Sequence, residues 1–357
     1  MAKERSKNNL NSPLFGIGVH KGYVLVSGGG GGKNYGLPNS LRVYKNQLPL
    51  ENPVCEVDFD TELLSQFEMA NNGLDYIVGA ISKFAAIFSI NSKSGEVSEI
   101  DRIEADFHEK EPEVTKTRWS QDNKIIISGG EEGILRVFKV NFAAPNQVSG
   151  FELTNELGQH SEGITDISIN SDNSLVVSAS TDKTCRIYTL KDEKCIKRLS
   201  FSEGIGMENL KFKGSLFSPD SRFLYALATS FKGRSYLIKW DAKSENFDPI
   251  DTTPVHTGPS CAFDLSSDGS NAAIGTNNGH VVAVNANSMS VYRSEKKHKM
   301  PITNICFNPN GTTILSVSGD HTYEVTQNRS QSSCCGLFIK LCFFLLLIGV
   351  LFYVYKG

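Results

Sequence analysis

The feature that most constrains the fold of this chain is an internal repeat, in which an apolar strand, a turn of small residues and a second apolar strand recur. Successive copies are mostly about 40 to 50 residues apart, the period of a β-propeller blade. Seven blades close into a ring without long exposed strand edges, so the repeat predicts an all-β, seven-bladed propeller over residues 13–327. The seven copies span residues 23–45, 76–90, 125–140, 175–190, 224–240, 272–285 and 314–326.

Turn-forming residues precede many of these copies, as in Trp119-Ser-Gln-Asp and Phe217-Ser-Pro-Asp, where Asp, Pro and Ser favour a turn between two strands. The pattern resembles the WD-repeat family, whose Trp-Asp pair occurs at Trp240-Asp241. In that family a His, a Ser, an Asp and an aromatic residue form a structural hydrogen-bond network. The resemblance places this network at His160, Ser178, Asp182 and Tyr188, and a similar one at His298, Ser316 and Asp320. It therefore argues against a hydrolase triad at these positions.

The C-terminus carries the second strong signal. Residues 335–355 are apolar except for Lys340, and about 20 such residues are enough to cross a bilayer as a helix. We therefore expect a single transmembrane helix at 335–355, a linker at 328–334 and a flexible N-terminal tail at 1–12. Residues 1–11 contain no apolar run of the kind that a signal peptide needs, which predicts that the propeller remains in the cytosol.

Charge and cysteine usage exclude two classes of function. The formal net charge is −3, and it becomes −5 without the C-terminal segment, which contributes Lys340 and Lys356. A nucleic-acid-binding protein normally presents a basic face, so no nucleic-acid partner is expected. The eight cysteines show no CxxC pair, which argues against a zinc site.

The first copy of the repeat has a much longer turn than the others. Thirteen residues, 28–40, separate Ser27 from Leu41, whereas six separate Ser128 from Leu135. Long insertions on one face of a propeller commonly carry binding functions. A phosphate-binding loop does not fit, because the GxxxxGK[ST] motif would need Gly at Ser27 and Ser or Thr at Asn34, and because a strand follows instead of a helix.

The composition of this loop leaves two interpretations open. Residues 28–40 contain glycines at 28–32 and 36 but no Asp or Glu, so backbone carbonyls could replace the hydration shell of a monovalent cation. Ca²⁺ or Mg²⁺ would be held poorly without carboxylates. On composition alone, a flexible loop without an ion is favoured over a potassium site.

The loop, which ends in Gly36-Leu37-Pro38-Asn39, the seven degenerate repeats and the C-terminal apolar segment together resemble one family. This is the endoplasmic-reticulum membrane exchange factor for the Sar-type small GTPase of the COPII coat, known in animals as the prolactin regulatory element-binding proteins. The resemblance implies that Asn39 is the catalytic residue of nucleotide exchange and that Leu37, Pro38 and Asn39 contact the GTPase. It also implies a bound potassium ion, with Gly31, Gly32, Asn34, Gly36 and Asn39 as the candidate ligands, and location in the endoplasmic-reticulum membrane.

Two rival functions remain at this stage. The first is a membrane-tethered scaffold that recruits COPII or cargo-related proteins without exchanging nucleotide, although such a scaffold has no need of Asn39. The second is a transcription factor, which the acidic balance and the expected anchor both oppose. No set of residues suggests covalent catalysis, so the chain is not expected to be an enzyme in that sense.

Overall fold

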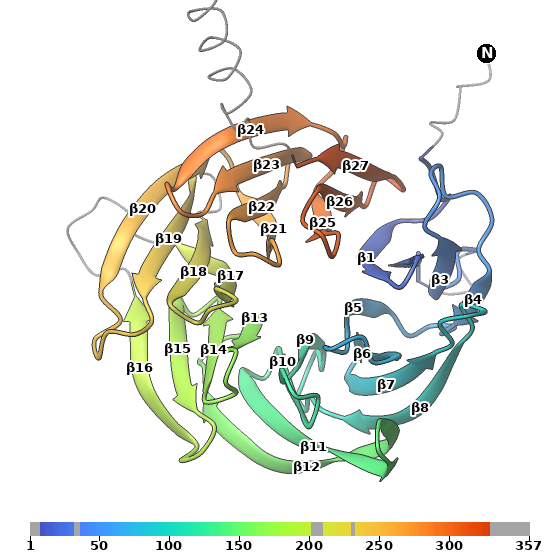
Figure 1. Ribbon diagram of the computed structural model, residues 1–357, viewed down its shortest axis with the longest axis horizontal. Helices are drawn as coiled ribbons and strands as arrows, with labels where there is room; N and C mark the ends of the chain where they lie inside the picture. Colours follow the sequence, from blue (N-terminus) through green and yellow to red (C-terminus); the bar gives the residue numbers. More distant parts are fainter. Residues whose placement is uncertain (1–7, 32–35, 201–209, 230–232, 329–357) are drawn as a thin grey trace, which may run out of the picture.

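The computed structural model describes residues 8–31, 36–200, 210–229 and 233–328. Their strands form seven antiparallel sheets arranged around a ring, with the first strand of each sheet nearest the centre (Figure 1). The predicted all-β, seven-bladed propeller is therefore confirmed. The seven repeat copies coincide with the two middle strands of the successive blades.

We number the blades in chain order. The strands are, in blade 1, β1 (Leu14–His20), β2 (Tyr23–Gly28), β3 (Ser40–Lys45) and β4 (Cys55–Asp58); in blade 2, β5 (Leu64–Met69), β6 (Tyr76–Ile81), β7 (Phe84–Ile90) and β8 (Val97–Glu104); in blade 3, β9 (Val114–Trp119), β10 (Ile125–Gly130), β11 (Ile134–Ala144) and β12 (Gln147–Gln159); in blade 4, β13 (Ile164–Ile169), β14 (Leu175–Ser180), β15 (Thr184–Thr189) and β16 (Lys194–Ser200); in blade 5, β17 (Lys211–Phe217), β18 (Phe223–Thr229), β19 (Ser235–Asp241) and β20 (Pro249–His256); in blade 6, β21 (Ser260–Leu265), β22 (Asn271–Thr276), β23 (His280–Asn285) and β24 (Ser290–Lys296); and in blade 7, β25 (Ile302–Phe307), β26 (Thr313–Ser318) and β27 (Tyr323–Gln327).

The turns between the first two strands of several blades follow the residue pattern that predicted them. Asp172 Oδ1 accepts a hydrogen bond from the backbone N–H of Ser174 at 2.9 Å, and Asp220 makes the same bond to Arg222 at 3.0 Å. Such a side chain closes a tight turn by bonding to its own backbone two residues later. The Asp and Asn residues in these turns therefore act locally and leave the strands free to pair.

The core lies between the blades. The middle strands are buried on both faces, because each sheet is covered by its neighbours in the ring. Leu25 and Leu41 of blade 1, for example, share one apolar cluster with Ile77 and Phe88 of blade 2. The outermost strands are the most exposed strands of the blades, as in β16. Each blade is therefore stabilised by packing against its neighbours rather than by a core of its own.

The N-terminal segment closes the ring, which corrects the predicted boundary of the tail. Tyr323 on β27 donates its backbone N–H to the carbonyl of Asn8 at 3.1 Å, and Leu10 donates to His321 at 2.9 Å. Leu10 is buried and Ser12 is only 2% exposed. Residues 8–12 therefore belong to the propeller, because they lie beside the last strand of blade 7, which has three strands among the described residues.

No helix among the described residues is long and apolar enough to span a bilayer. The predicted transmembrane helix at 335–355 and all of the predicted linker except Asn328 lie outside those residues. Asn328 itself is held against blade 7, since its backbone N–H donates to the carbonyl of Thr312 at 2.8 Å.

Candidate functional site

The long loop of blade 1 joins β2 to β3, and its two ends are tied together. Gly28 pairs with Ser40 across the hairpin, and the N–H of Gly30 donates to the carbonyl of Leu37 at 3.2 Å. The N–H of Gly29 donates to the carbonyl of Pro13 at 2.9 Å, which attaches the start of the loop to the N-terminal segment. Residues 32–35, which include two of the predicted ion ligands, lie outside the described part of the chain.

Asn39 lies at the base of the loop and is only 2% exposed. Its side-chain Nδ2 donates to the carbonyl of Asp60 at 3.1 Å, and its own carbonyl accepts a hydrogen bond of 2.8 Å from Phe59. A Cβ placed on Gly29 would lie 2.0 Å from Asn39 Oδ1, so the backbone of Gly29 packs directly on this side chain. In the free propeller Asn39 therefore braces the loop against the connection between β4 and β5, and its side-chain amide is buried.

Leu37 and Pro38 are partly exposed. Together with the N-terminal segment and the outer strands of blade 1, they line a cavity of about 360 Å³. Two residues of the predicted GTPase contact are thus accessible, and they border a groove of mixed polar and apolar character. The remaining lining residues are Asn9, Leu10, Asn11, Ser12, Arg42, Tyr44, Leu50, Glu51, Pro53 and Glu56.

The described part of the loop, residues 28–31 and 36–40, carries no charged side chain. Gly31 and Gly36 are exposed and have φ angles of 95° and 74°, a left-handed backbone that glycine adopts without strain. The oxygens that they and Asn39 contribute are neutral. No group of three or more His, Cys, Asp or Glu residues capable of holding a metal occurs in the described residues.

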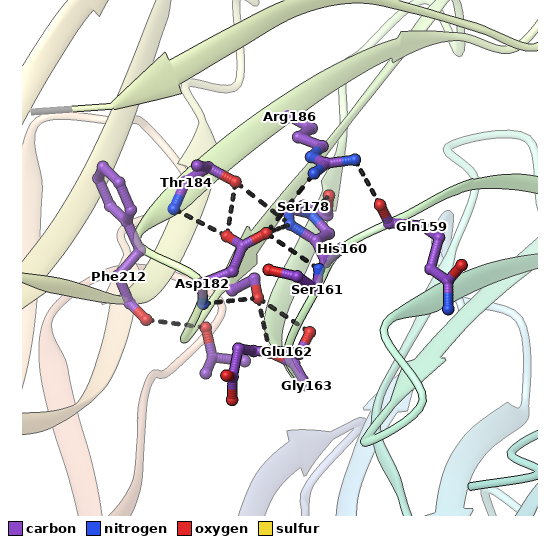
Figure 2. A network of polar contacts seen from close by, with 12 residues as sticks. Gln159, His160, Ser161, Glu162, Gly163, Ser178, Asp182, Thr184, Arg186 and Phe212 are labelled. Atoms are coloured by element: carbon purple, nitrogen blue, oxygen red, sulfur yellow. Dashed lines mark hydrogen bonds and ion pairs between the residues drawn. The ribbon is translucent and has the colours of Figure 1, made fainter.

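The polar network of blade 4 is present as predicted for His160, Ser178 and Asp182 (Figure 2). His160 Nε2 lies 2.7 Å from Ser178 Oγ, and Nδ1 lies 2.8 Å from Asp182 Oδ2. Burial lowers the pKa of His160, although the hydrogen bond to Asp182 opposes this shift. The side chains of His160 and Asp182 are almost fully buried, so no substrate reaches them and the network is structural.

One member of this network differs from the prediction. The buried Tyr188 hydroxyl lies beside Ser178 and Arg186 but makes no well-formed hydrogen bond to either. The carboxylate of Asp182 is bound instead by Thr184, whose Oγ1 lies 2.6 Å from Asp182 Oδ1. Blade 7 repeats the arrangement, with His298 bonded to Ser316 and Thr322, each at 2.8 Å. A small β-branched hydroxyl can reach the turn carboxylate from the adjacent strand end, whereas the Tyr188 ring extends into the apolar cluster between blades 3 and 4.

Sequence reasoning missed Arg42, which joins the loop to its surroundings. Its side chain is 13% exposed, and its guanidinium donates to the carbonyl of Leu10 at 2.9 Å and to Ser12 Oγ at 2.6 Å. It also donates to Ser40 Oγ at 3.1 Å, beside Asn39. A signal was available, because an arginine between two apolar residues recurs in Leu41-Arg42-Val43, Leu135-Arg136-Val137 and Cys185-Arg186-Ile187.

Sequence reasoning also missed a charged cluster in a cavity of about 330 Å³ that the innermost strands line. Asp166 Oδ1 lies 3.0 Å from Arg118 Nη2 and 3.3 Å from Lys116 Nζ. Burial raises the pKa of Asp264 to about 6, while the N–H of Phe307 opposes this shift. These strands are far apart in sequence, so only the closed ring brings the charges together.

Comparisons with known proteins agree with the fold. The family model of the WD domain, G-beta repeat, matches residues 104–139, 151–189 and 289–324. Two solved structures, "COPII on membranes, outer coat vertex" and "The structure of the COPII coat assembled on membranes", each superpose with a TM-score of 0.76 at 15% identity over 90% of this chain. The matches cover 85% and 47% of those chains, and at this identity they establish the fold alone.

Sequence similarity extends to several curated proteins. The chain is 26% identical over 220 residues to SEC12-like protein 2 of Arabidopsis thaliana, which covers 61% of this chain and 52% of that protein. It is also 26% identical over 213 residues to cilia- and flagella-associated protein 52 of Homo sapiens, covering 58% of this chain and 30% of that protein. The chain thus spans about half, or less, of the length of these relatives.

Proposed function

We propose that this chain, a WD-repeat propeller similar to the Sec12-like proteins, is a guanine nucleotide exchange factor. It would promote GDP release from a Sar-type small GTPase and so start assembly of the COPII coat. The observation that carries the proposal is the Gly-rich loop of blade 1, which is long, braced at its base by Asn39 and partly exposed at Leu37 and Pro38. Likeness to SEC12-like protein 2 supports the choice of partner.

Exchange of this kind needs no acid, base or nucleophile. The propeller binds the nucleotide-free GTPase more tightly than the loaded form, and by linkage it weakens nucleotide binding by the same factor. A loop that keeps its shape on docking loses little conformational entropy, so more of the contact energy is available to displace the nucleotide. The hydrogen bonds of Gly29, Gly30 and Asn39 at the loop base would supply that rigidity.

Within this proposal Leu37 and Pro38 contact the GTPase directly, and Asn39 acts through the loop that it braces. The 2% exposure of Asn39 and its hydrogen bond to Asp60 support a positioning role. Loss of the Asn39 amide would release the loop end from the β4–β5 connection. The predicted importance of Asn39 for exchange is therefore retained, with a different physical reason.

A potassium ion is part of the proposal. The carbonyls of Gly31, Gly32 and Gly36, with Asn34 and Asn39, would hold it, since these neutral oxygen donors suit a monovalent cation. When bound, the ion would supply a positive charge that holds the loop carbonyls together. The residues of the chain would still make the contact with the GTPase.

Membrane attachment completes the proposal. A helix at 335–355 would place the propeller on the cytosolic side of the endoplasmic-reticulum membrane. Confinement to one surface raises the effective concentration of two partners, which favours encounter with a GTPase that also binds that membrane.

The test is GDP release from a purified Sar-type GTPase, measured with the full chain in lipid vesicles and potassium buffer. Wild type is compared with Asn39→Ala and with Leu37→Asp, after thermal unfolding has shown that all three are folded. We expect wild type to accelerate release and each variant to lose about tenfold of the acceleration, equivalent to about 1.4 kcal/mol of coupling free energy. Binding of the GTPase without any acceleration by wild type would instead identify the chain as a scaffold.

A further inference from the structure

The contacts of Arg42 point to a role that builds on the proposed function. We propose that Arg42 is a positioning residue for the Gly-rich loop, and that through it the N-terminal residues 10–13 become part of the exchange site. An arginine occupies the same strand position in three blades, and its contacts differ in blade 1.

Arg42, Arg136 and Arg186 are each the third residue of the third strand of a blade. Arg136 donates to the carbonyl of Ala105 at 2.8 Å, and Arg186 donates to the carbonyl of Gln159. Arg42 donates to the carbonyl of Leu10. In all three blades, therefore, this arginine binds the backbone of the segment that leads into its own blade.

The second partner of each arginine differs in blade 1. Arg136 pairs with Glu132 at 2.7 Å and Arg186 with Asp182 at 3.6 Å, and both carboxylates lie in the short turn between the second and third strands. The corresponding loop of blade 1 contains no carboxylate. Arg42 binds Ser40 Oγ at the loop end instead, and Ser12 Oγ in the N-terminal segment. Its carboxylate partner is Glu56 on the outer strand β4, at 3.2 Å, just as Arg136 also pairs with Glu156 on β12 at 2.8 Å.

Blade 1 also lacks the histidine network that fixes the turn in blades 4 and 7. Val26 faces Arg42 in the strand register, whereas Ser178 faces Arg186 at the same place. Leu10 stands four residues before β1, as His160 stands four residues before β13. The described part of the loop contains no charged side chain of its own, so Arg42 is the charged group that fixes the base of the loop.

These contacts link both ends of the loop to one side chain. At the end of the loop, Arg42 binds Ser40, which follows Asn39. At its start, Arg42 fixes residues 10 and 12, and the next residue, Pro13, accepts the N–H of Gly29. A charge-assisted hydrogen bond is about twice as strong as a neutral one, so loss of the guanidinium would loosen both ends together.

The experiment measures backbone hydrogen exchange in the full chain, with Arg42→Gln as the variant and Arg136→Gln as the matched control from blade 3. We expect amide hydrogen exchange at residues 28–31, 36, 37, 39 and 40 to rise about tenfold in Arg42→Gln, the effect of losing a charged hydrogen bond. Arg136→Gln should leave these amides unchanged. Arg42→Lys, which keeps the charge, should restore part of the protection. Equal loop exchange in Arg42→Gln and Arg136→Gln would overturn the proposal.

If Arg42→Gln does not fold, Ser12→Ala becomes the deciding variant, because it removes only the 2.6 Å hydrogen bond from Arg42 Nη2 to Ser12 Oγ. A several-fold rise in the hydrogen-exchange rate of the Gly29 amide in Ser12→Ala supports the proposal, and an unchanged rate refutes it. GDP release is then measured for the folded variants, and we expect the half-saturating propeller concentration to rise about tenfold in Arg42→Gln.

The amide measurement needs no GTPase, so it separates the two proposals. If wild type does not accelerate GDP release, the proposed function is wrong. The amide hydrogen-exchange data would still decide whether Arg42 holds the loop. If Arg42→Gln loosens the loop but leaves GDP release unchanged, the position of the loop does not govern nucleotide exchange.

Discussion

Asn39 Nδ2 donates a 3.1 Å hydrogen bond to the carbonyl oxygen of Asp60, and the two residues belong to different connections of the ring. Asn39 ends the long loop of blade 1, whereas Asp60 lies between β4 and β5, where the chain passes into blade 2. The bond therefore fastens the loop to the junction of two blades. Its position explains why a residue expected at a protein interface is buried, and it suggests several measurements.

Gly29→Ala should displace Asn39. The added methyl carbon would lie 2.0 Å from Asn39 Oδ1 and 2.6 Å from its Cα, far inside van der Waals contact. We expect a loss of about 1–3 kcal/mol in the free energy of unfolding, typical of overpacking. Urea denaturation measures it, with Gly258→Ala as the control, since its nearest neighbours would lie 3.6 Å away. Equal stability of the two variants would contradict the described packing.

The propeller should lose stability on mild acidification through His160 and His298. Burial lowers the pKa of both side chains, so each binds a proton more readily in the unfolded chain. Their contribution is then complete above the unfolded pKa of about 6.5 and is lost as the pH falls through the folded value. We expect the melting temperature to fall between pH 7.5 and 5.5 by about 2–4 °C more in wild type than in the double His→Gln variant.

The comparison of pH slopes isolates the two histidines. Carboxyl groups with raised pKa values contribute the opposite slope, but they do so equally in both proteins. Burial raises the pKa of Glu113 and Glu131, and neighbouring carboxylates add to this effect. If the melting temperature depends on pH in the same way in wild type and in the His160→Gln, His298→Gln variant, the two histidines are not buried as neutral groups.

Asp264→Asn should stabilise the propeller at pH 7.5. Burial raises the pKa of Asp264 to about 6, above the unfolded value, so its favourable contribution is present at low pH and is lost as the pH rises through about 6. The amide keeps an oxygen that can accept the Phe307 N–H and carries no charge to desolvate. Thermal unfolding should show a gain of about 1–2 kcal/mol at pH 7.5 and a smaller gain at pH 5. A loss at both pH values would mean that the charge of Asp264 is needed in the cavity.

A chain that begins at residue 13 should be markedly less stable than one that begins at residue 8. It lacks the buried Leu10 side chain and the backbone hydrogen bonds to His321 and Tyr323. We expect a loss of about 2–4 kcal/mol from these contacts together. Chemical denaturation of the two proteins measures this difference. Equal denaturant concentrations at the unfolding midpoint would show that residues 8–12 do not close the ring.

Local pattern was enough to predict the blades. Each repeat contains its own strands and turn residues, and Asp172 and Asp220 act on backbone groups only two positions away. The histidine networks were equally readable, since His160, Ser178 and Asp182 lie in one blade. Thr184 was missed because both it and Tyr188 are buried, and only the geometry of the turn shows which hydroxyl reaches Asp182.

The sequence by itself determined that this chain forms a seven-bladed propeller, and that its first blade carries a Gly-rich loop unlike the others, because strand periodicity and turn chemistry act over a few residues. The tertiary structure alone decided that residues 8–12 complete blade 7, that Asn39 is buried against Asp60, and that Arg42 joins the loop to the N-terminal segment. These contacts connect residues from 21 to more than 300 positions apart, and their geometry exists only after the ring has closed.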